Sequence, residues 1–293
     1  MQTFLREIRI YQWPKNFVVF AALVFAQQAH LSSQVIRSLW AFGVLCLASS
    51  AVYVFNDLLD IEKDRAHPDK CMRPLASGAM SVPAGIALMV LLGAASLVGA
   101  GLLNVPFLGA VVAYTILNIL YSVALKNAVI IDALTVAIGF VVRAVAGAVA
   151  LQVEFSNWLV VCTLFLALFL SLGKRRREIE LMREGATHHR EVLGHYSVPF
   201  LDALSVVMAG ATLLTYTIYT CSPEVVERLG TDKLYLTLPF VVYGLFRYLY
   251  LVHHKDGGGD PTKELVGDKP LLITVLIWGL ACVGIIYGGR FLE

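Results

Sequence analysis

Long apolar runs separated by short polar stretches recur along the chain, from near residue 15 to near residue 288. A membrane-spanning helix needs about 20 mostly apolar residues, so each long run is expected to form one. The predicted spans are nine, at residues 15–30, 36–56, 82–104, 106–123, 128–152, 156–173, 198–221, 235–252 and 270–288. Gln27 and Gln28 interrupt the first, which makes it the least regular. The pattern predicts an all-α integral membrane protein with residues 1–293 in a single domain.

The overall composition agrees with this expectation. Of the 293 residues, 58% are hydrophobic and 15% are charged, and the mean hydropathy is +0.73. Such values exclude an ordinary soluble domain, and the lipid bilayer is therefore an expected partner. The formal net charge of +2 says little about other partners. No nucleic acid is expected to bind.

The basic residues fall mostly on one side of this predicted topology. Lys and Arg gather at the N-terminus and in four loops, at about 56–81, 124–128, 174–197 and 253–269, whereas the opposite side holds only four basic residues. Because Lys and Arg favour cytoplasmic loops, we expect the N-terminus and these loops in the cytoplasm and the C-terminus across the membrane. The predicted location is the inner (plasma) membrane, with the active site facing the cytoplasm.

A row of polar residues follows the second apolar run. Asn56, Asp57, Asp60 and Asp64 recur at three- and four-residue spacing, so on a continuing helix their side chains share one face. Like charges this close repel, and an all-oxygen cluster suits Mg²⁺, which commonly binds one or two carboxylates together with substrate phosphates. The alternative is a structural cluster of salt bridges to the basic residues that follow. The basic residues that follow are Lys63, Arg65, Lys70 and Arg73. In a metal site, they would attract the anionic groups that the metal bridges.

A second charged group lies at the end of the sixth apolar run. Lys174 and Arg175 stand four and three residues before Glu178, so these three side chains can face one site, while Arg176 and Arg177 point elsewhere. This arrangement favours substrate contact by the first three residues. A solvated basic stop at the membrane boundary is the alternative, above all for Arg176 and Arg177.

Isolated polar residues inside or beside apolar runs form a third group. Arg143 lies within an apolar run, where a guanidinium is costly unless it finds an anion. Asp132 precedes it by eleven residues, about three turns, so the two could pair; alternatively, Arg143 could hold a phosphate. Lys15 and Lys126 lie at predicted cytoplasmic ends, where snorkelling explains them as readily as catalysis does. The glycine-rich stretch 255–270 is interpreted as a flexible connection.

These motifs resemble those of a known superfamily. The run from Asn56-Asp57 through Asp60 and Asp64-Arg65 to His67-Pro68, Lys70, Arg73-Pro74 and Ser77-Gly78 is similar to the first signature of UbiA-type prenyltransferases. That resemblance implies nine transmembrane helices around a central cavity open to the cytoplasm. Aromatic-ring prenyltransferases of the superfamily carry a second Asp-rich motif after helix six. Here Gly173 to Glu178 stands instead and resembles the decaprenyl-phosphate phosphoribosyltransferase branch, as do Gln12–Asn16 and the stretch 259–270.

The resemblance implies a reaction and its substrates. Phosphoribosyl pyrophosphate would be the donor and a decaprenyl-type polyprenyl phosphate the acceptor, with Mg²⁺ as cofactor. The product, polyprenyl-phosphoryl-5-phosphoribose, would supply cell-envelope glycans such as arabinan. Two alternatives remain: a prenyltransferase acting on an aromatic acceptor, which the basic second motif argues against, and a transporter or lipid carrier. Charge gathered at one membrane face rather than at mid-membrane argues against the transporter.

The resemblance also implies roles for the candidate residues. The metal would be held by Asn56, Asp57, Asp60 and Asp64. The donor phosphates would be held by Lys70, Arg73, Lys126 and Arg143, with Tyr53 near the sugar. The acceptor phosphate or the 5-phosphate would be held by Lys15, Lys174 and Arg175, and Glu178 faces the same site. The residues expected to carry the chemistry are Asp57, Asp60, Asp64, Lys70 and Arg73. Lipid chain length and oligomeric state are not predicted.

Overall fold

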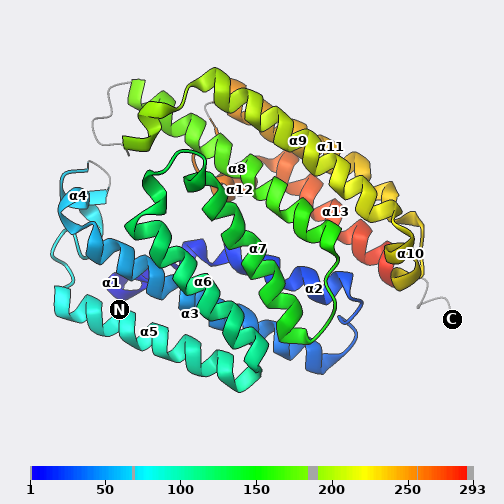
Figure 1. Ribbon diagram of the computed structural model, residues 1–293, viewed down its shortest axis with the longest axis horizontal. Coiled ribbons are helices and arrows are strands. Elements are labelled where there is room, and N and C mark those ends of the chain that lie inside the picture. Colours follow the sequence, from blue (N-terminus) through cyan, green and yellow to red (C-terminus); the bar gives the residue numbers. More distant parts are fainter. Residues whose placement is uncertain (1, 68–69, 184–190, 256, 289–293) are drawn as a thin grey trace. The chain divides into compact units, whose positions relative to one another are not determined.

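The computed structural model describes residues 2–67, 70–183, 191–255 and 257–288, and all the regular elements in this part of the chain are helices (Figure 1). Pro68, quoted above within the first signature, lies outside the described residues. The chain forms two compact units. Unit 1 comprises Met1–Leu23, Leu31–Lys126 and Val142–Val153, and unit 2 comprises Val24–His30, Asn127–Val141 and Glu154–Glu293.

Unit 1 contains the first charged motif. Its helices, with η marking 3-10 helices, are α1 (Gln2–Glu7), η1 (Ile10–Val19), α3 (Ser32–Leu59), α4 (Ile61–Arg65), η2 (Lys70–Met72), α5 (Val82–Leu103) and α6 (Val105–Val123). The short helices α2 (Phe20–Phe25) and η3 (Leu125–Asn127) and the long helix α7 (Ile131–Leu151) have residues in both units.

Unit 2 contains the second charged motif. Its helices are α8 (Asn157–Arg183), η4 (Glu191–His195), α9 (Val198–Cys221), α10 (Pro223–Leu229), η5 (Lys233–Thr237), α11 (Leu238–His254), α12 (Pro261–Gly267) and α13 (Lys269–Gly288). The most extensive helix packing in this unit is between α8 and α9, which lie side by side in Figure 1. Helix α8 continues well past the predicted boundary at residue 173, so the basic second motif is helical.

Eight helices of the described residues are long and apolar enough to cross a membrane. They begin at Ser32, Val82, Val105, Ile131, Asn157, Val198, Lys233 and Lys269, and they match eight of the nine predicted spans. The remaining prediction, 15–30, is not one continuous helix. Pro14 lies inside the 3-10 helix η1, and Gln27 has a left-handed backbone (φ 56°) just after the short helix α2. The count of nine spans is therefore not confirmed.

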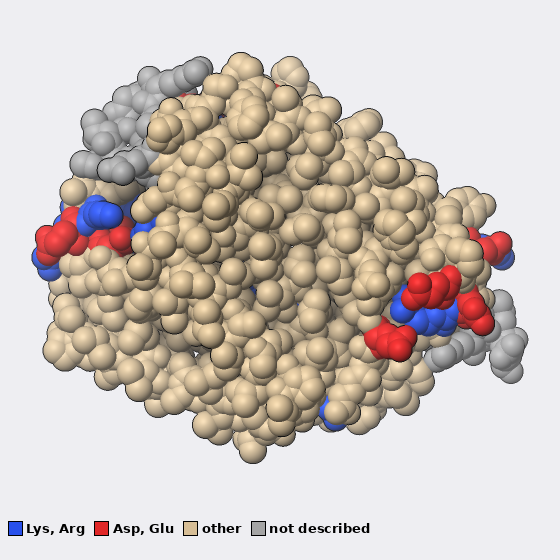
Figure 2. Space-filling model, in the orientation of Figure 1, with Lys and Arg blue, Asp and Glu red and all other residues tan. Residues whose placement is uncertain are grey.

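Helices α5 and α6 form a tight hairpin in unit 1. Asn104 ends α5 and begins α6, accepting a hydrogen bond from the amide of Phe107 at 2.8 Å, while Pro106 occupies the first turn, where a missing N–H costs nothing. The Asn104 side chain also donates to the carbonyl oxygens of Val149 and Ala150 on α7. Neither α5 nor α6 carries a charged residue, so their surface is tan, without red or blue, in Figure 2. Such faces suit contact with lipid.

The core of unit 1 depends on one close backbone approach. Val19 at the end of η1 packs with Ala41, Leu45, Phe107 and Ala146 in a fully buried cluster. Gly147 on α7 lies so near η1 that a Cβ there would be 2.3 Å from the Val19 carbonyl oxygen. Only glycine permits this spacing, and it fixes η1, with its Lys15 and Asn16, against α7.

Candidate functional site

The predicted acidic row lies where α3 ends. The helix stops at Leu59, Asp60 leaves helical geometry (φ −104°, ψ 16°), and Asp64 lies on the short helix α4. The sequence predicted one continuous helix for this row, but the row is divided between two helices. The i to i−4 bonding nevertheless runs on, because the amide of Asp60 donates to Asn56 and that of Asp64 donates to Asp60. The expected common face is thus largely kept despite the break.

Arg73 joins two members of this row. Its Nη1 donates to Asp57 Oδ1 at 3.0 Å and to Asp64 Oδ2 at 2.6 Å. Both carboxylates are buried. The Arg73 guanidinium lies between the two carboxylates and offsets their mutual repulsion. From the sequence, a metal ion was expected to have this effect.

Arg9 is a second cation on Asp57, and sequence reasoning missed it. Its Nη2 donates to both oxygens of Asp57, at 2.6 Å to Oδ2, and its guanidinium lies over the Tyr53 ring at 5.0 Å. Arg9 had counted only as one of the basic residues of the N-terminus. Its left-handed backbone (φ 52°) turns the chain between α1 and η1. Its position just before the Gln12–Asn16 motif was the one feature of the sequence that could have indicated a role for Arg9 in the site.

Asp60 has its own cation. Lys126, the middle residue of η3, donates to its two carboxylate oxygens at 3.0 and 3.3 Å. Both side chains keep some exposure, so this pair can open to solvent more readily than the buried pairs of Asp57. Of the other predicted site residues in unit 1, Asn56, Tyr53 and Lys15 are half-buried and Lys70 is exposed.

The acids are thus held by protein cations, the alternative considered from the sequence. Within the described residues, no three His, Cys, Asp or Glu side chains are gathered where a metal could be held. The donor chemistry of Asp57 and Asp64 still fits Mg²⁺, since that ion commonly binds through one or two carboxylates and takes its other oxygens from substrate phosphates and water. The four-ligand metal site remains a prediction.

The hydrogen-bond partners of the Arg143 side chain in unit 1 include neutral groups. Its Nε donates to Asn16 Oδ1 at 2.9 Å, its Nη2 donates to the Tyr114 hydroxyl at 2.8 Å, and its guanidinium lies 4.6 Å from the Tyr114 ring centre. Asn16 donates in turn to Cys46 Sγ and Ser49 Oγ on α3. Asn16 is buried, and sequence reasoning had given it no role beyond its motif.

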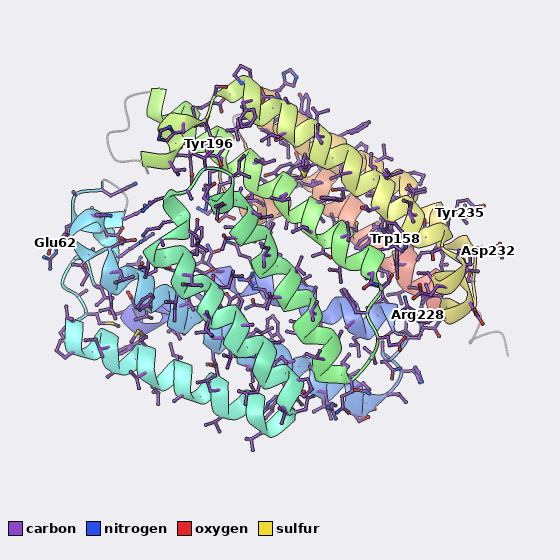
Figure 3. All side chains as sticks on the ribbon, in the orientation of Figure 1. Glu62, Trp158, Tyr196, Arg228, Asp232 and Tyr235 are labelled. Carbon is purple, nitrogen blue, oxygen red and sulfur yellow. The ribbon has the colours of Figure 1, made fainter. Side chains whose placement is uncertain are left out.

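Asp132 belongs to a buried network in unit 2. It accepts from Arg175 Nε at 2.5 Å and from the Tyr196 hydroxyl at 2.7 Å, and that hydroxyl accepts from the amide of Ile130. Pairing with Arg143, one of the two alternatives that the sequence left open, is not among these bonds of Asp132. Figure 3 labels Tyr196, a residue that sequence reasoning missed because its neighbours in sequence carry no motif. Burial, and then the bond to Asp132, raises the pKa of Tyr196 to about 12.

The basic second motif is divided between two sets of partners. Arg175 Nη1 donates to Glu178 at 2.8 Å, as the spacing predicted. Arg176 instead bonds Glu180 and Asp202, so it does point elsewhere. Because Arg175 is almost fully buried between its carboxylates, it acts first as a bridge from α8 to α7. Direct substrate contact by Arg175, Glu178 and the half-buried Lys174 remains a prediction.

The glycine-rich stretch near residue 258 packs against this motif. Gly257 and Gly258 are buried, and Gly258 has a left-handed backbone (φ 96°) while its amide donates to Glu264 at 3.1 Å. A Cβ on Gly258 would lie 3.0 Å from the carbonyl oxygen of Gly173. Gly258 therefore serves close packing on α8, and Gly257 packs against Leu251 and Glu264, a different role from the flexible connection expected from composition.

Known proteins resemble this chain over nearly its full length. The UbiA prenyltransferase family matches residues 16–264. The decaprenyl-phosphate phosphoribosyltransferase of Mycobacterium tuberculosis (strain H37Rv) is 31% identical over 286 residues, which cover 96% of this chain and 92% of that protein. The protein of the same name from Corynebacterium glutamicum is 31% identical over 292 residues, covering 97% of this chain and 86% of that one.

A solved structure shares the fold. A UbiA homolog from Archaeoglobus fulgidus, determined with GPP and Mg²⁺ bound, aligns with a TM-score of 0.74. The alignment covers 97% of this chain and 100% of that chain at 18% sequence identity. At that identity the likeness shows a common helical fold and nothing about substrates.

Proposed function

The chain belongs to the UbiA prenyltransferase family, and from this premise we propose that it moves 5-phosphoribose from phosphoribosyl pyrophosphate to a polyprenyl phosphate. The family resemblance and the helical membrane fold expected from the sequence are confirmed. The choice of substrates is carried by one observation: relatives 31% identical over nearly the whole chain are named decaprenyl-phosphate phosphoribosyltransferases. The basic motif on α8 supports it, because a donor with a 5-phosphate needs cations there.

The donor diphosphate is proposed to bind at the acidic row of unit 1. Asp57 and Asp64, with Asp60 and Asn56 beside them, would hold Mg²⁺, which when bound neutralises the charge of a departing pyrophosphate. Arg73 and Lys126 already lie on these carboxylates. Both can turn from a carboxylate to a phosphate oxygen, since a guanidinium or ammonium bonds either anion. Lys70 and Arg143 are proposed as further phosphate contacts, with Tyr53 near the sugar.

The reaction itself asks little proton chemistry of the protein. An oxygen of the lipid phosphate forms a bond to C1 of the ribose, the bond from C1 to the diphosphate oxygen breaks, and the electron pair leaves with pyrophosphate. The configuration at C1 inverts. A phosphate monoester dianion is already a nucleophile, so no general base is required. The protein contributes orientation of the two substrates and stabilisation of charge, which can supply a large share of the rate.

The acceptor phosphate is proposed to meet Lys15 or the second motif, where Lys174, Arg175 and Glu178 lie on α8. The product would be polyprenyl-phosphoryl-5-phosphoribose, a precursor of cell-envelope glycans. Transfer is proposed to take place at the cytoplasmic face of the inner membrane, because the acidic row and its cations fall in the loops that carry most of the basic residues.

A transfer assay separates this proposal from its rival. Purified protein is incubated with Mg²⁺, polyprenyl phosphate and phosphoribosyl pyrophosphate labelled in the ribose. We expect the label to enter the lipid fraction. A parallel reaction contains a prenyl diphosphate and an aromatic acid. Consumption of those two substrates, with no ribose label in lipid, would instead identify an aromatic prenyltransferase.

A further inference from the structure

Glu7 is a buried carboxyl group beside the acidic row. It is the last residue of α1 and is 1% exposed. The two residues that follow Glu7 are hydrogen-bonded to α3. The Ile8 carbonyl accepts from Ser50 at 2.7 Å, and Arg9 donates to Asp57. Among the described residues, neither carboxyl oxygen of Glu7 has a partner at good hydrogen-bond geometry, and the only group that approaches as a donor is the backbone amide of Leu75. Burying such a group unpartnered is costly, so its presence calls for a role.

The charges around Glu7 are those of the proposed donor site. Burial, and next the neighbouring Asp57, raises the pKa of Glu7 to about 7, while Arg9, Arg73 and the Leu75 amide act in the opposite direction. Both arginines are engaged with Asp57. Glu7 therefore lies within electrostatic reach of two guanidinium groups that are bonded to another carboxylate.

Binding of a divalent cation at Asp57 creates a difficulty that Glu7 can resolve. A metal ion at Asp57 competes with both guanidinium groups for its two oxygens and repels them, which favours departure of at least one. A guanidinium left without an anion in a buried place is strongly unfavourable. Arg73 is also bonded to Asp64 and is a proposed donor contact, but Arg9 has its bonds on Asp57. Glu7 is a nearby carboxylate with no cationic side chain bonded to it in the described part of the chain, and it could receive Arg9.

We propose that Glu7 is a positioning residue, the alternative carboxylate that takes over Arg9 when a divalent cation and the donor diphosphate occupy Asp57. This inference rests on the proposed function and extends it. Glu7 does not touch the substrate. It lowers the cost of freeing Asp57 and keeps Arg9 beside the site.

The proposal predicts opposite effects on stability and on binding. In Glu7→Gln, the buried carboxyl is replaced by a neutral group of the same shape, so the ligand-free protein should unfold at the same or a higher temperature. The affinity for Mg²⁺ in the presence of phosphoribosyl pyrophosphate should fall about tenfold, because Arg9 has lost its second partner. Glu7→Asp, which keeps the charge on a shorter side chain, should fall between wild type and Glu7→Gln.

The test measures thermal unfolding without ligand and Mg²⁺ binding by titration calorimetry with phosphoribosyl pyrophosphate present. Glu62→Gln is the matched control, since Glu62 is an exposed carboxylate on α4 (Figure 3) and should change neither quantity. Wild-type affinity in Glu7→Gln, or loss of its ligand-free stability, would overturn the inference and leave the proposed function intact. Absence of any binding by the wild-type protein would overturn the proposed function, and the exchange with it.

Discussion

At the scale of single residues, the acidic row is governed by which cation reaches which acid. The spacing of Asp57, Asp60 and Asp64 predicted their common face, because helical periodicity is a local property. Their partners could not be predicted in the same way. Arg73 reaches two of them only because the chain after α4 folds back, and Arg9 reaches Asp57 only through the turn before η1.

Removing the shared cation should unsettle both buried acids. Arg73→Ala leaves Asp64 without its guanidinium and Asp57 with Arg9 alone, so we expect a loss of about 3 kcal/mol in the free energy of unfolding, as for other broken buried ion pairs. Arg73→Lys should recover only part of this, because one ammonium lacks the planar fork of donors. Unfolding in detergent measures both variants. Stability equal to wild type in Arg73→Ala would show that these pairs contribute nothing.

The Tyr196–Asp132 bond gives a pH-dependent prediction. Burial, and then the bond to Asp132, raises the pKa of Tyr196 to about 12 in the folded protein, from an ordinary value of 10. Between these values the folded phenol keeps its proton while the unfolded one loses it, so this bond's contribution is full below pH 10 and is lost as the pH rises towards 12. Tyr196→Phe should therefore be destabilised by about 1–2 kcal/mol at pH 8. Its difference from wild type should shrink above pH 10, and a constant difference up to pH 12 would contradict this.

At the scale of elements, sequence reasoning found the long helices and missed the irregular one. Eight apolar runs became helices of spanning length because their length and composition leave little choice. The first run holds Pro14 and ends near the left-handed Gln27, and it became η1 and α2. Its conformation is fixed by tertiary packing against Gly147, and no local pattern announces such a contact.

Enlarging Gly147 should displace η1. A Cβ at this position would lie 2.3 Å from the Val19 carbonyl oxygen, so either η1 or α7 must move in Gly147→Ala. We expect a loss of about 1–3 kcal/mol, as for other overpacked cores, together with weaker substrate binding because Asn16 and Lys15 move with η1. Gly93→Ala on α5 is the control, since nothing lies within 4 Å of its Cβ position. If both variants unfold at the same temperature, the close approach is not limiting.

At the scale of the whole chain, composition and one motif were enough to predict a helical membrane enzyme of the right family. Hydrophobic runs set the number of elements approximately, and the Asn56–Gly78 signature indicated the family. The assignment of cations to acids could not follow, since residues such as Arg9 and Asp57 are 48 positions apart. Orientation in the membrane remains a prediction from the basic loops.

Two native cysteines can test that orientation. Cys71 lies in the loop expected in the cytoplasm, and Cys221 is exposed at the end of α9, on the expected opposite side. A membrane-impermeant maleimide added to intact cells should label Cys221 and spare Cys71, and inverted vesicles should give the reverse pattern. Variants lacking one cysteine each identify the labelled site. Labelling of Cys71 from outside would reverse the predicted topology.

The most direct measurement for the account as a whole is the rate of ribose transfer to lipid by Asp60→Asn, compared with wild type and with Glu62→Gln. Asp60 and Lys126 form an ion pair in which both side chains are partly exposed to solvent. The neutral variant should therefore keep its fold, as its unfolding temperature would show. We predict that Asp60→Asn transfers label about 100-fold more slowly or worse, in keeping with loss of one transition-state charge contact, while Glu62→Gln keeps the wild-type rate. An Asp60→Asn protein that transfers ribose at the wild-type rate would contradict the placement of the donor site at this acidic row.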